Sequence, residues 1–567
     1  MDRRWLHKTL PPQSLVDALS ASINVNPLLA TLLTQRGVHT YDEARKFFRP
    51  SLQDLHDPYL MKGMDRAVVR LKEAIGQNEK ILIYGDYDVD GTTAVALVYS
   101  FLSDFYPHCA FYVPDRASEG YGVSQAGVLW AEANGFSLIV ALDLGIKASD
   151  MVLLANQKAI DFIICDHHQP GKEIPRAVAV LDPKQQDCPY PFKELSGCGI
   201  GFKLIQAYAR KYLDESIVFE YLDLVVVSIA SDIVPIHDEN RILSYHGLKK
   251  LNSNPRPGLK ALIEIAGVRN ELDISNVVFT IGPRINAAGR VAHGSGAVEL
   301  LISKSVEEAN AFAEKVNLKN DLRREFDASI TEEALAMISG DERSQKAKTT
   351  VLFKNTWHKG VIGIVAARCI ERYYRPTIIL TESNGKITGS ARSVNGFDLY
   401  QAIEKCSDLL EKFGGHKYAA GLTLDPMNLP AFEQRFEEVV AATITEEMLT
   451  PFIEIDLQID FDALTPKFQS VMKQMSPFGP ENQRPVFESG NIFVLNSLTT
   501  FKDRHVRFLA GQKDNNNFFT AVGFDLIQHH QRLQSGDAFS IVFSVEESTF
   551  NGTTSVQLRL KDIKFDQ

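Results

Sequence analysis

The chain has 567 residues, of which 45% are hydrophobic and 23% charged, and its formal net charge at pH 7 is −11. This length predicts about three or four domains, and the negative charge argues against a protein that coats nucleic acid through overall positive charge, although a local basic groove can coexist with it. No apolar run reaches the roughly 18 residues of a membrane helix, the first residues lack a signal-peptide core, and the six cysteines form no CxxC pair, so we expect a cytoplasmic protein with no membrane contact, zinc site or disulfide framework.

Residues 1–65 are predicted to form a helical lead-in, because apolar residues recur there at helical spacing. After it, strand-like apolar runs alternate with helical patterns, which is typical of a parallel sheet covered on both faces. The strands are expected at 81–84, 110–113, 137–142 and 161–165, and the helices at 67–75, 92–102 and 123–133.

Three aspartates, Asp86, Asp88 and Asp90, follow the first strand at alternate positions, where an open α/β sheet places its ligands. Carboxylates this close stay ionised when a cation lies among them, and Asp oxygens suit Mg²⁺ or Mn²⁺. An EF-hand is excluded because the twelfth residue of the loop is Leu97 instead of Glu. A P-loop is excluded because no Lys precedes the Thr pair. A solvated acidic turn is the alternative.

Further acidic and histidine residues follow three later apolar runs. Each Asp alone is more often a helix cap, and a His pair alone is often ordinary surface or core. Together, one edge of the fold could gather them, and that number of carboxylates with an imidazole suits two cations better than one. The residues are Asp143 after 137–142, Asp166, His167 and His168 after 161–165, and Asp232 after 223–230.

The order and spacing of these motifs resemble the DHH phosphoesterase superfamily. Its signature strings stand here as GDYDVDG, DLG, DHH and SIASD over about residues 80–240, followed by GPRINAAGR at 282–290. GSARS at 389–393 and GGHKYAAG at 414–421 resemble the associated DHHA1 domain. With WHKGVIGIVAAR and SPFGPENQRPVF downstream, the set is similar to the bacterial branch of 5′-end single-strand DNA exonucleases.

The resemblance implies two cation sites. Asp88 and Asp143 would hold one cation, with Asp143 bridging to the second. Asp90, His167 and Asp232 would complete the second site.

The resemblance also implies roles beside the cations. Asp166 and His168 would join Asp143 in the catalytic group, with His168 orienting the site or contacting the scissile phosphate. Asp86 would be an occasional metal ligand. Relatives with an HxxxDxD motif carry a His where this chain has Tyr84, and this departure leaves the first metal's ligands open.

A stretch without Pro or Gly, residues 304–338, is predicted to be one long helix or two in line. In the lobe that follows, the glycines of GGHKYAAG allow close approach to a phosphate or sugar, and an arginine can bind a phosphate bidentately. An isolated Arg is more often a surface ion-pair partner, but within these motifs we favour phosphate binding. The candidate substrate residues are Arg284, Arg290, Ser390, Arg392 and His416.

From about residue 450, short strands separated by polar turns predict a small barrel of the OB type. Such barrels bind single strands by stacking bases on aromatic side chains in a basic groove. The alternative is that the phenylalanines form the barrel core, which we expect for at least half of them. The candidates are Phe508, Phe518 and Phe519, with Lys502, Arg504 and Arg507.

The predicted fold is α/β: a parallel-sheet catalytic domain, joined by a long helix to a smaller α/β domain, and then a C-terminal OB-like barrel. The predicted domains are a lead-in at 1–65, the DHH catalytic domain at 66–300, a connecting helix at 301–345, the DHHA1 substrate-binding domain at 346–445 and the nucleic-acid-binding barrel at 446–567.

The residues predict a two-metal hydrolysis of a phosphodiester that needs no Ser or Cys nucleophile. The resemblance implies 5′→3′ degradation of single-stranded DNA to mononucleotides, dependent on Mn²⁺ or Mg²⁺, in recombination, DNA repair and mismatch repair. A cleft between the lobes would admit one strand and exclude a duplex. Implied partners are single-stranded DNA-binding protein and a RecQ-type helicase. The absence of an obvious dimerisation stripe favours a monomer.

Two alternatives belong to other functional classes. An enzyme of the same superfamily that cleaves oligoribonucleotides or cyclic dinucleotides would share the metal site, but such enzymes are usually shorter. A non-catalytic scaffold would be expected to lose the carboxylates, and here they are all present.

Overall fold

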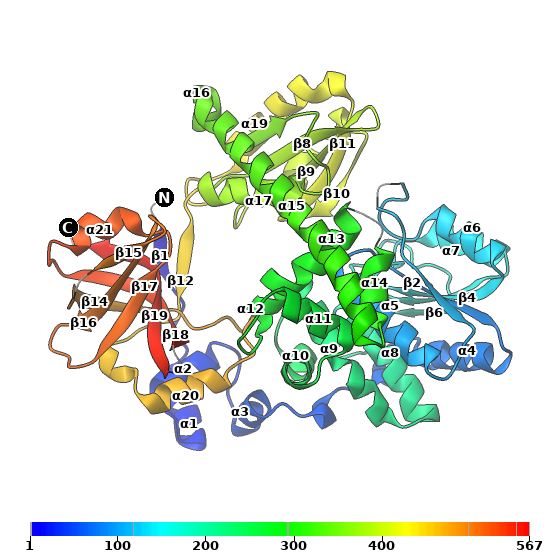
Figure 1. Cartoon of the computed structure of the whole chain (residues 1–567), viewed down its shortest axis with the longest axis horizontal. Helices are drawn as coiled ribbons and strands as arrows, with labels where there is room; N and C mark the ends of the chain where they lie inside the picture. The colour runs from blue at the N-terminus through cyan, green and yellow to red at the C-terminus, as the bar shows by residue number, and fades with distance from the viewer. Residues whose placement is uncertain (1–2, 117, 292–293, 497, 551–552, 566–567) are drawn as a thin grey trace. The chain divides into compact units, whose positions relative to one another are not determined.

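The computed structural model describes residues 3–116, 118–291, 294–496, 498–550 and 553–565 (Figure 1). Contacts divide the chain into two compact units. Unit 1 comprises Met1–Phe47, Arg324–Met475 and Arg484–Gln567, and unit 2 comprises Phe48–Arg323 and Ser476–Gln483.

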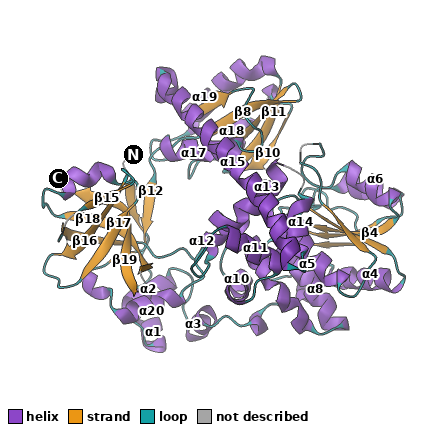
Figure 2. Ribbon diagram, viewed as in Figure 1, coloured by secondary structure: helices purple, strands orange, loops and turns teal. Residues whose placement is uncertain are grey.

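A five-stranded parallel sheet with the order β3-β2-β4-β5-β6 forms the centre of unit 2 (Figure 2). Its side chains alternate between two cores: Ile81 and Ile83 pack with α4, α5 and α8, whereas Leu82 and Tyr84 pack with α6 and α7. Helices therefore cover both faces, as predicted. The strands are β2 Lys80–Gly85, β3 Cys109–Tyr112, β4 Phe136–Leu142, β5 Asp161–Cys165 and β6 Ala179–Leu181, and the helices are α4 Met64–Gly76, α5 Val89–Ser103, α6 Gln125–Ala133, α7 Ser149–Gln157 and α8 Gly197–Tyr212.

Side-chain caps define where three of these helices begin. Asp88 accepts a hydrogen bond from the backbone N–H of Gly91, and Ser124 and Ser196 start α6 and α8 in the same way. Such caps satisfy N–H groups that have no partner within the helix. Two of these helix starts lie at the predicted site: Asp88 is one of the candidate metal ligands, and the start of α8, after Ser196, contacts Asp90.

The run 223–230, which was identified in the sequence only as apolar, is a helix. α9 (Leu222–Ser231) is buried over Leu222–Ala230, and a helix that is apolar all round lies in a core. Periodicity alone does not separate such a helix from a buried strand. Asp232 therefore follows the end of a helix, whereas the other acidic motifs follow strands.

The rest of unit 2 is mainly helical. Its further described helices are the 3-10 helices η1 Leu52–Asp54, η2 Pro58–Leu60 and η3 Glu215–Tyr221, then α10 Asp238–Ser253, α11 Pro257–Ile265, α12 Ile274–Asn276, the π-helix η4 Val277–Ile281, α13 Gly282–Val291 and α14 Ser295–Ile302. α15 runs unbroken from Val306 to Gly340, so the predicted long helix is confirmed as a single one. The division between the units falls within α15, after Arg323.

Unit 1 contains a mixed sheet in the order β10-β11-β9-β8-β7. β7 and β8 are parallel and the other neighbours are antiparallel. α18 and α19 share one core with the sheet, and α17 and the end of α15 share another. The bounds are β7 Thr350–Phe353, α17 Ile362–Arg372, β8 Thr377–Ser383, β9 Lys386–Arg392, α18 Leu399–Glu404, β10 Lys412–His416, β11 Ala419–Leu424 and α19 Leu429–Thr443, with α16 Glu342–Lys346 before them.

Unit 1 also contains a closed β-barrel, which confirms the OB-like prediction. The strand order β14-β18-β19-β17-β16 closes through a pairing of β14 with β16. β12 (Phe452–Ile455) instead pairs with β1 (Arg4–His7) near the N-terminus. The other strands are β13 Leu457–Gln458, β14 Phe487–Val494, β15 Thr499–Phe501, β16 His505–Gln512, β17 Phe518–Gly523, β18 Phe539–Phe550 and β19 Thr553–Phe565.

Two helices interrupt the region that was predicted to be all-β. α20 (Pro466–Gln474) is capped by Thr465 and begins with a proline, and this pair of residues is a sequence signal for the start of a helix. α21 (His530–Leu533) is a single turn.

Residues 3–65 contain the helices α1 Gln13–Ile23, α2 Pro27–Thr34 and α3 Tyr41–Phe48 in addition to β1, and the division between the two units falls after Phe47. Among the described helices, none alone has the length and apolar character needed to cross a membrane, and α1 and α2 meet that test only as a sharply bent pair.

Candidate metal centre

The acidic motifs meet at one edge of the parallel sheet. Asp86, Asp143 and Asp166 each follow the last residue of a strand, and the strands end in register, with Gly85 beside Leu142 and Leu142 beside Cys165. The carboxyl ends of parallel strands are where such folds bind ligands. Asp232, from the end of α9, completes the cluster from the helical side.

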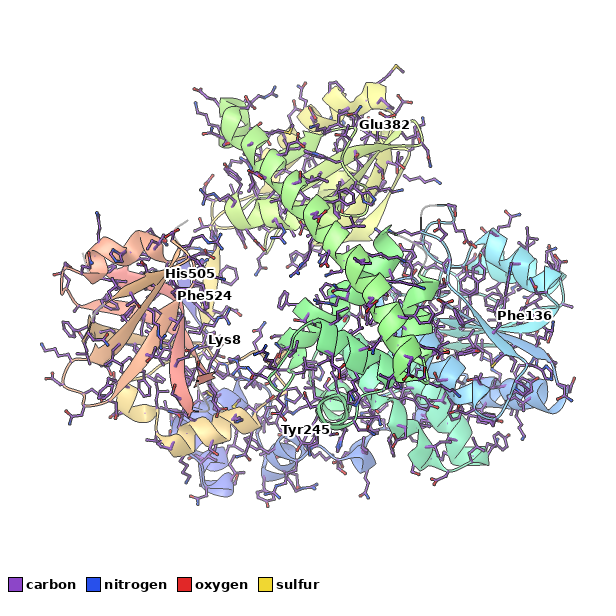
Figure 3. All side chains as sticks on the ribbon, in the orientation of Figure 1. Lys8, Phe136, Tyr245, Glu382, His505 and Phe524 are labelled. Carbon is purple, nitrogen blue, oxygen red and sulfur yellow. The ribbon has the colours of Figure 1, made fainter. Side chains whose placement is uncertain are left out.

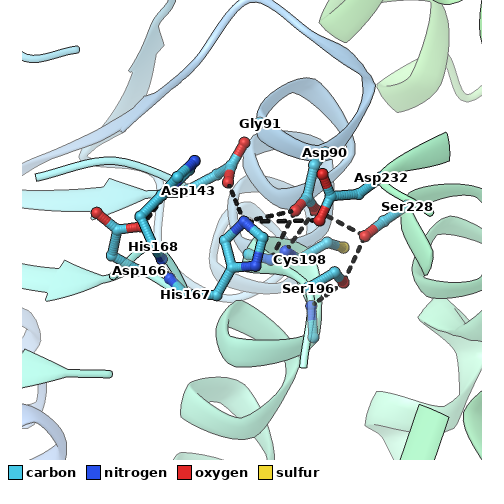
Figure 4. A network of polar contacts seen from close by, with 12 residues as sticks. Asp90, Gly91, Asp143, Asp166, His167, His168, Ser196, Cys198, Ser228 and Asp232 are labelled. Carbon is cyan, nitrogen blue, oxygen red and sulfur yellow. Dashed lines mark hydrogen bonds and ion pairs between the residues drawn. The ribbon is translucent and has the colours of Figure 1, made fainter. Parts of the chain in front are cut away.

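His167 lies among the carboxylates (Figure 4). Its Nε2 is 3.2 Å from Oδ1 of Asp143, 3.6 Å from Oδ2 of Asp232 and 3.7 Å from Oδ2 of Asp90. Among the residues that the structure describes, three groups have candidate ligand atoms within 4.8 Å of one another: Asp86, Asp88 and Asp143; Asp90, His167 and Asp232; and Asp143, His167 and His168.

The backbone around Asp143 and Asp86 is unusually tight. Asp143 has φ +61°, in the left-handed region that Asp tolerates better than most residues. A Cβ at Gly197 would lie 2.5 Å from the Cβ of Asp143, and a Cβ at Gly91 would lie 2.5 Å from the backbone oxygen of Asp86. The glycines thus allow the helices α5 and α8 to approach the acidic residues closely.

Asp90 is held by α8 and α9. Its carboxylate accepts hydrogen bonds from the backbone N–H groups of Gly197 and Cys198, at 2.6 and 2.8 Å, and from the hydroxyl of Ser228 at 2.6 Å. The helix N-terminus supplies these donors in a region of positive potential. Sequence reasoning missed these residues, although the cap pattern Ser-Gly-Cys-Gly at Ser196 was a usable signal.

Asp166 orients His168. Nδ1 of His168 lies 2.7 Å from Oδ1 of Asp166, and the same carboxylate accepts hydrogen bonds from the backbone N–H groups of Ile146, His167 and His168. Burial opposes ionisation of Asp166, but these hydrogen bonds outweigh it and lower its pKa. Burial likewise lowers the pKa of His168, and the bond to Asp166 outweighs it, so the net pKa is raised.

Burial and mutual repulsion raise the pKa of four carboxyl groups, those of Asp86, Asp88, Asp143 and Asp232. Burial lowers the pKa of His167, which favours the neutral imidazole that binds metals. Within the described part of the chain, Oδ1 of Asp86, Oδ1 of Asp143 and Nδ1 of His167 are buried without a hydrogen-bond partner. Buried acceptors left unpaired are costly. Hard divalent cations fit this donor set.

Three further residues near the centre were missed. Tyr121, in the loop before α6, places its hydroxyl 3.1 Å from Nε2 of His168. Asp182 follows β6, the next strand of the same sheet edge, and burial raises its pKa to about 7. Lys184 places a positive charge near His167 and Asp232. Asp182 was detectable as one more Asp directly after a short apolar run.

Tyr84 does not face the cluster. Its side chain packs on the α6 side of the sheet, and its hydroxyl accepts a hydrogen bond from the backbone N–H of Ser124 at 3.1 Å. Burial raises its pKa to about 12. The position that holds a His in some relatives therefore supplies no ligand group here among the described residues.

Three of the predicted substrate residues share one face of the mixed sheet in unit 1. Arg392 and His416 both lie opposite Ala419, and Ser390 lies two residues before Arg392, so their side chains project to the same side. Arg392 donates a hydrogen bond to Ser390 Oγ at 3.2 Å. A Cβ at Gly363, at the start of α17, would lie 2.7 Å from Ser390 Oγ and 2.9 Å from Arg392 Nη2.

The two other predicted substrate residues belong to unit 2. Arg284 donates hydrogen bonds to Asn317 Oδ1 at 3.0 Å and to the Thr280 carbonyl at 2.7 Å, which ties α13 to α15. Arg290 lies in α13, but its side chain is outside the described residues.

The barrel candidates divide into core and surface. Phe508 is buried and Phe519 packs edge-on against Phe461, whereas Phe518 is 59% exposed. Phe524, which was not predicted, is also exposed and lies beside His505 (Figure 3), with the guanidinium of Arg559 over its ring. The basic candidates are all exposed: Lys502, Arg504 and Arg507.

Family models match three parts of the chain: the DHH family N-terminal domain at residues 80–229, the DHHA1 domain at 345–442 and the RecJ OB domain at 455–562. The chain is thus a DHH protein with a DHHA1 domain.

Comparison with individual proteins identifies the family within the DHH proteins to which the chain belongs. The single-stranded-DNA-specific exonuclease RecJ of Bacillus subtilis is 37% identical over 97% of this chain and 70% of its own length, and that of Escherichia coli is 30% identical over 95% and 96%. A crystal structure of RecJ from Thermus thermophilus in complex with Mn²⁺ superposes with a TM-score of 0.84 at 26% identity, covering all of this chain and 80% of that one. The chain belongs to the RecJ family.

Proposed function

We propose that the protein is a metal-dependent exonuclease that degrades single-stranded DNA from its 5′ end to mononucleotides. The observation that carries the proposal is the buried cluster of Asp and His residues at the carboxyl edge of the parallel sheet. Membership of the RecJ family supports the substrate, because the curated relatives are single-stranded-DNA-specific exonucleases.

Two divalent cations, Mn²⁺ or Mg²⁺, are proposed for the cluster. Asp88 and Asp143 would hold one cation and Asp90, His167 and Asp232 the other, with Asp143 as a ligand that both could share and Asp86 as an occasional further ligand. Bound cations lower the pKa of water and stabilise the negative charge of a phosphodiester during its hydrolysis. Support comes from the repulsion among the carboxylates and from their unpaired buried oxygens, since a cation relieves both.

His168 is proposed to hold the scissile phosphate. Asp166 fixes its Nδ1, and this leaves Nε2 to donate a hydrogen bond to a phosphate oxygen. The raised pKa of His168 keeps the ring protonated to higher pH than an isolated imidazole, so the hydrogen bond is charge-assisted. The Tyr121 hydroxyl contacts Nε2 of His168 in this structure. When a phosphate binds Nε2, this hydroxyl would move away or contact the same phosphate.

The 5′ end is proposed to bind at the shared face of Ser390, Arg392 and His416, with Arg284 and Arg290 as further phosphate contacts. A planar guanidinium beside a hydroxyl matches a phosphate group, and the Arg392–Ser390 contact supports this. The barrel is proposed to stack bases on exposed aromatic side chains.

The cellular assignments follow from the family alone. We propose a cytoplasmic monomer that acts in recombination, DNA repair and mismatch repair, with single-stranded DNA-binding protein and a RecQ-type helicase as partners.

The deciding experiment uses single-stranded DNA labelled at either end, with Mn²⁺ or with a chelator. Mononucleotides should leave the 5′ end first, only with metal, and not from blunt duplex. Asp143→Ala should abolish the reaction but leave DNA binding intact. Asp514→Ala is the matched control, because Asp514 has a similar left-handed backbone at φ +59° and is exposed. Hydrolysis of dinucleotides without hydrolysis of DNA would assign the protein to the small-substrate branch.

A further inference from the structure

A short segment of the C-terminal half of the chain folds with unit 2. Residues Ser476–Gln483 belong to unit 2, whereas the chain on both sides of them belongs to unit 1. We call this segment, SPFGPENQ, the strap. The function proposed above gives it no role.

The strap contacts residues that lie four to nine positions after Asp232 in the chain. The backbone N–H of Ile236 donates a hydrogen bond of 2.8 Å to the Pro480 carbonyl, and Nε2 of His237 lies 3.0 Å from Oε2 of Glu481. From the next helix, the buried Arg241 donates a hydrogen bond of 3.0 Å to the Ser476 carbonyl. The strap thus follows the chain from Ile236 into the first turn of α10.

The packing at Gly479 is closer than any side chain permits. A Cβ there would lie 2.5 Å from Cγ1 of Ile236 and 3.6 Å from Cγ2 of Ile274. The backbone of Gly479 is not left-handed, so glycine is needed there for lack of space and not for backbone conformation. The strap therefore fits against Ile236 with no room for even a methyl group.

The loop that the strap contacts begins with a strained residue. Ile233, directly after Asp232, has φ +60°, which is a true outlier for a β-branched side chain. Such a conformation is unfavourable and persists only where the surroundings enforce it. Ile233 is 62% exposed, so its own side chain contributes little packing that would enforce it.

The loop is enforced from both of its ends. On the α9 side, the N–H of Asp232 donates a hydrogen bond to the Ser228 carbonyl at 2.9 Å. At the end next to α10, the side-chain amide of Asn240 donates a hydrogen bond to the Pro235 carbonyl at 3.0 Å. The backbone N–H of Ile236 donates one to the strap, at the Pro480 carbonyl. Without the strap, the hydrogen bond from Asn240 would still restrain this end of the loop, but the one from Ile236 would be lost.

We infer that the strap is a positioning element for the metal centre, which holds the loop after α9 in its strained form and thereby aims the carboxylate of Asp232 at the site shared with Asp90 and His167. The inference rests on the proposed role of Asp232 as a cation ligand. Groups that position metal ligands typically change metal affinity about 10- to 100-fold when removed.

The test is the affinity of the full chain for Mn²⁺, measured by titration with electron paramagnetic resonance of the free ion. Gly479→Ala forces Ile236 to move and should weaken one Mn²⁺ site by about 10- to 100-fold, with nuclease activity restored at saturating Mn²⁺. Gly76→Ala is the matched control, because no atom lies within 4 Å of a Cβ at that position, and it should bind Mn²⁺ as the parent does.

Two further variants keep the test decisive if Gly479→Ala does not fold. Ile236→Ala removes the side chain on which Gly479 packs and should weaken the same site. Combining it with Gly479→Ala relieves the clash, so the double variant should bind more tightly than Gly479→Ala. Parental affinity and stoichiometry in Gly479→Ala, or in Ile236→Ala where the first is unfolded, would overturn the inference.

Asp232→Asn separates this inference from the proposed function. If the parent binds no Mn²⁺, or if Asp232→Asn binds as tightly as the parent, the proposed cation site is wrong. If Asp232→Asn loses a site while the strap variants keep it, only the strap inference fails.

Discussion

Asp143 shows how much a single residue carries in this fold. It is buried, it has a left-handed backbone, and its carboxylate lies 3.2 Å from His167 between two groups of ligand atoms. Asp and Asn tolerate this backbone region better than other non-glycine residues. Substitution of Asp143 by Asn therefore removes the charge while keeping a residue that tolerates this backbone conformation.

Asp143→Asn should inactivate the enzyme and stabilise the metal-free protein. The substitution keeps shape and backbone preference but removes a buried negative charge from among like charges, whose repulsion raises the pKa of Asp143. Thermal unfolding in chelator at neutral pH should give a melting temperature several degrees higher, which corresponds to about 1–3 kcal/mol. Asp514→Asn, at an exposed left-handed position, should change neither property. A metal-free melting temperature that stays at the parental value would show that repulsion costs little here.

At the scale of elements, a buried ion pair joins α8 to α10. Nζ of Lys203 lies 2.5 Å from Oε1 of Glu239, and both side chains are fully buried. Tyr190 donates a hydrogen bond to Oε2 of Glu239 at 2.5 Å, and the backbone N–H of His56 donates one to Oε1 at 2.9 Å. These bonds connect the helix that holds Asp90 to the helix that follows the Asp232 loop.

Glu239→Ala should be severely destabilising, because it leaves the Lys203 ammonium group buried without its counter-charge. Loss of one partner of a buried pair costs about 3–5 kcal/mol, and urea unfolding of the full chain should detect it. The double variant Lys203→Met/Glu239→Leu removes both charges and should cost less than Glu239→Ala. A larger loss in the double variant would mean that packing, and not the ion pair, dominates.

On the barrel, Phe518 should contribute to DNA binding without contributing to stability. It is 59% exposed, and stacking of one base on an aromatic ring is worth about 1–3 kcal/mol. Phe518→Ala should therefore weaken binding of single-stranded DNA by roughly 5- to 150-fold at an unchanged melting temperature, as measured by fluorescence anisotropy in chelator. Leu10→Ala, which removes an equally exposed apolar side chain, is the control. Equal affinity of parent and Phe518→Ala would place the bases elsewhere.

Four of the five strands of the parallel sheet and most of the acidic cluster were predictable from the sequence, because apolar runs that alternate with helical patterns and end near an Asp give a local signal, whereas the short β6 was missed. Asp86, Asp90, Asp143 and His167 were found in this way. The residues that hold the cluster were not: Ser228 and Cys198 contact Asp90 across more than 100 residues of chain. Phe508 and Phe518 illustrate the remaining limit, since the same residue type lies in the core at one position and on the surface at the other.

At the scale of the whole molecule, the chain has two units and the described candidate metal groups all lie in unit 2. Ligands that bind only the folded state stabilise it by mass action. Unit 2 is therefore the part of the molecule whose stability should depend on metal.

Calorimetry should show this difference directly. Mn²⁺ at about 100 times its dissociation constant should stabilise unit 2 by about 2.7 kcal/mol per site, so one unfolding transition should move upward while the transition of unit 1 stays in place. Asp143→Asn should abolish most of the shift. A single transition, or two that shift equally, would show that the units unfold together.

The strap also orders events in time. When Arg323 has been synthesised, nearly all of unit 2 is present except the strap. Residues 324–475 must then be synthesised before Ser476, the first residue of the strap, is added. At about 5–20 residues per second, this interval lasts roughly 8–30 s. During that interval the loop after α9 lacks its hydrogen bond from Ile236 to the strap, so on the inference above the nascent chain completes its metal centre after the mixed sheet of unit 1 has been synthesised and before the barrel strands β14–β19 follow.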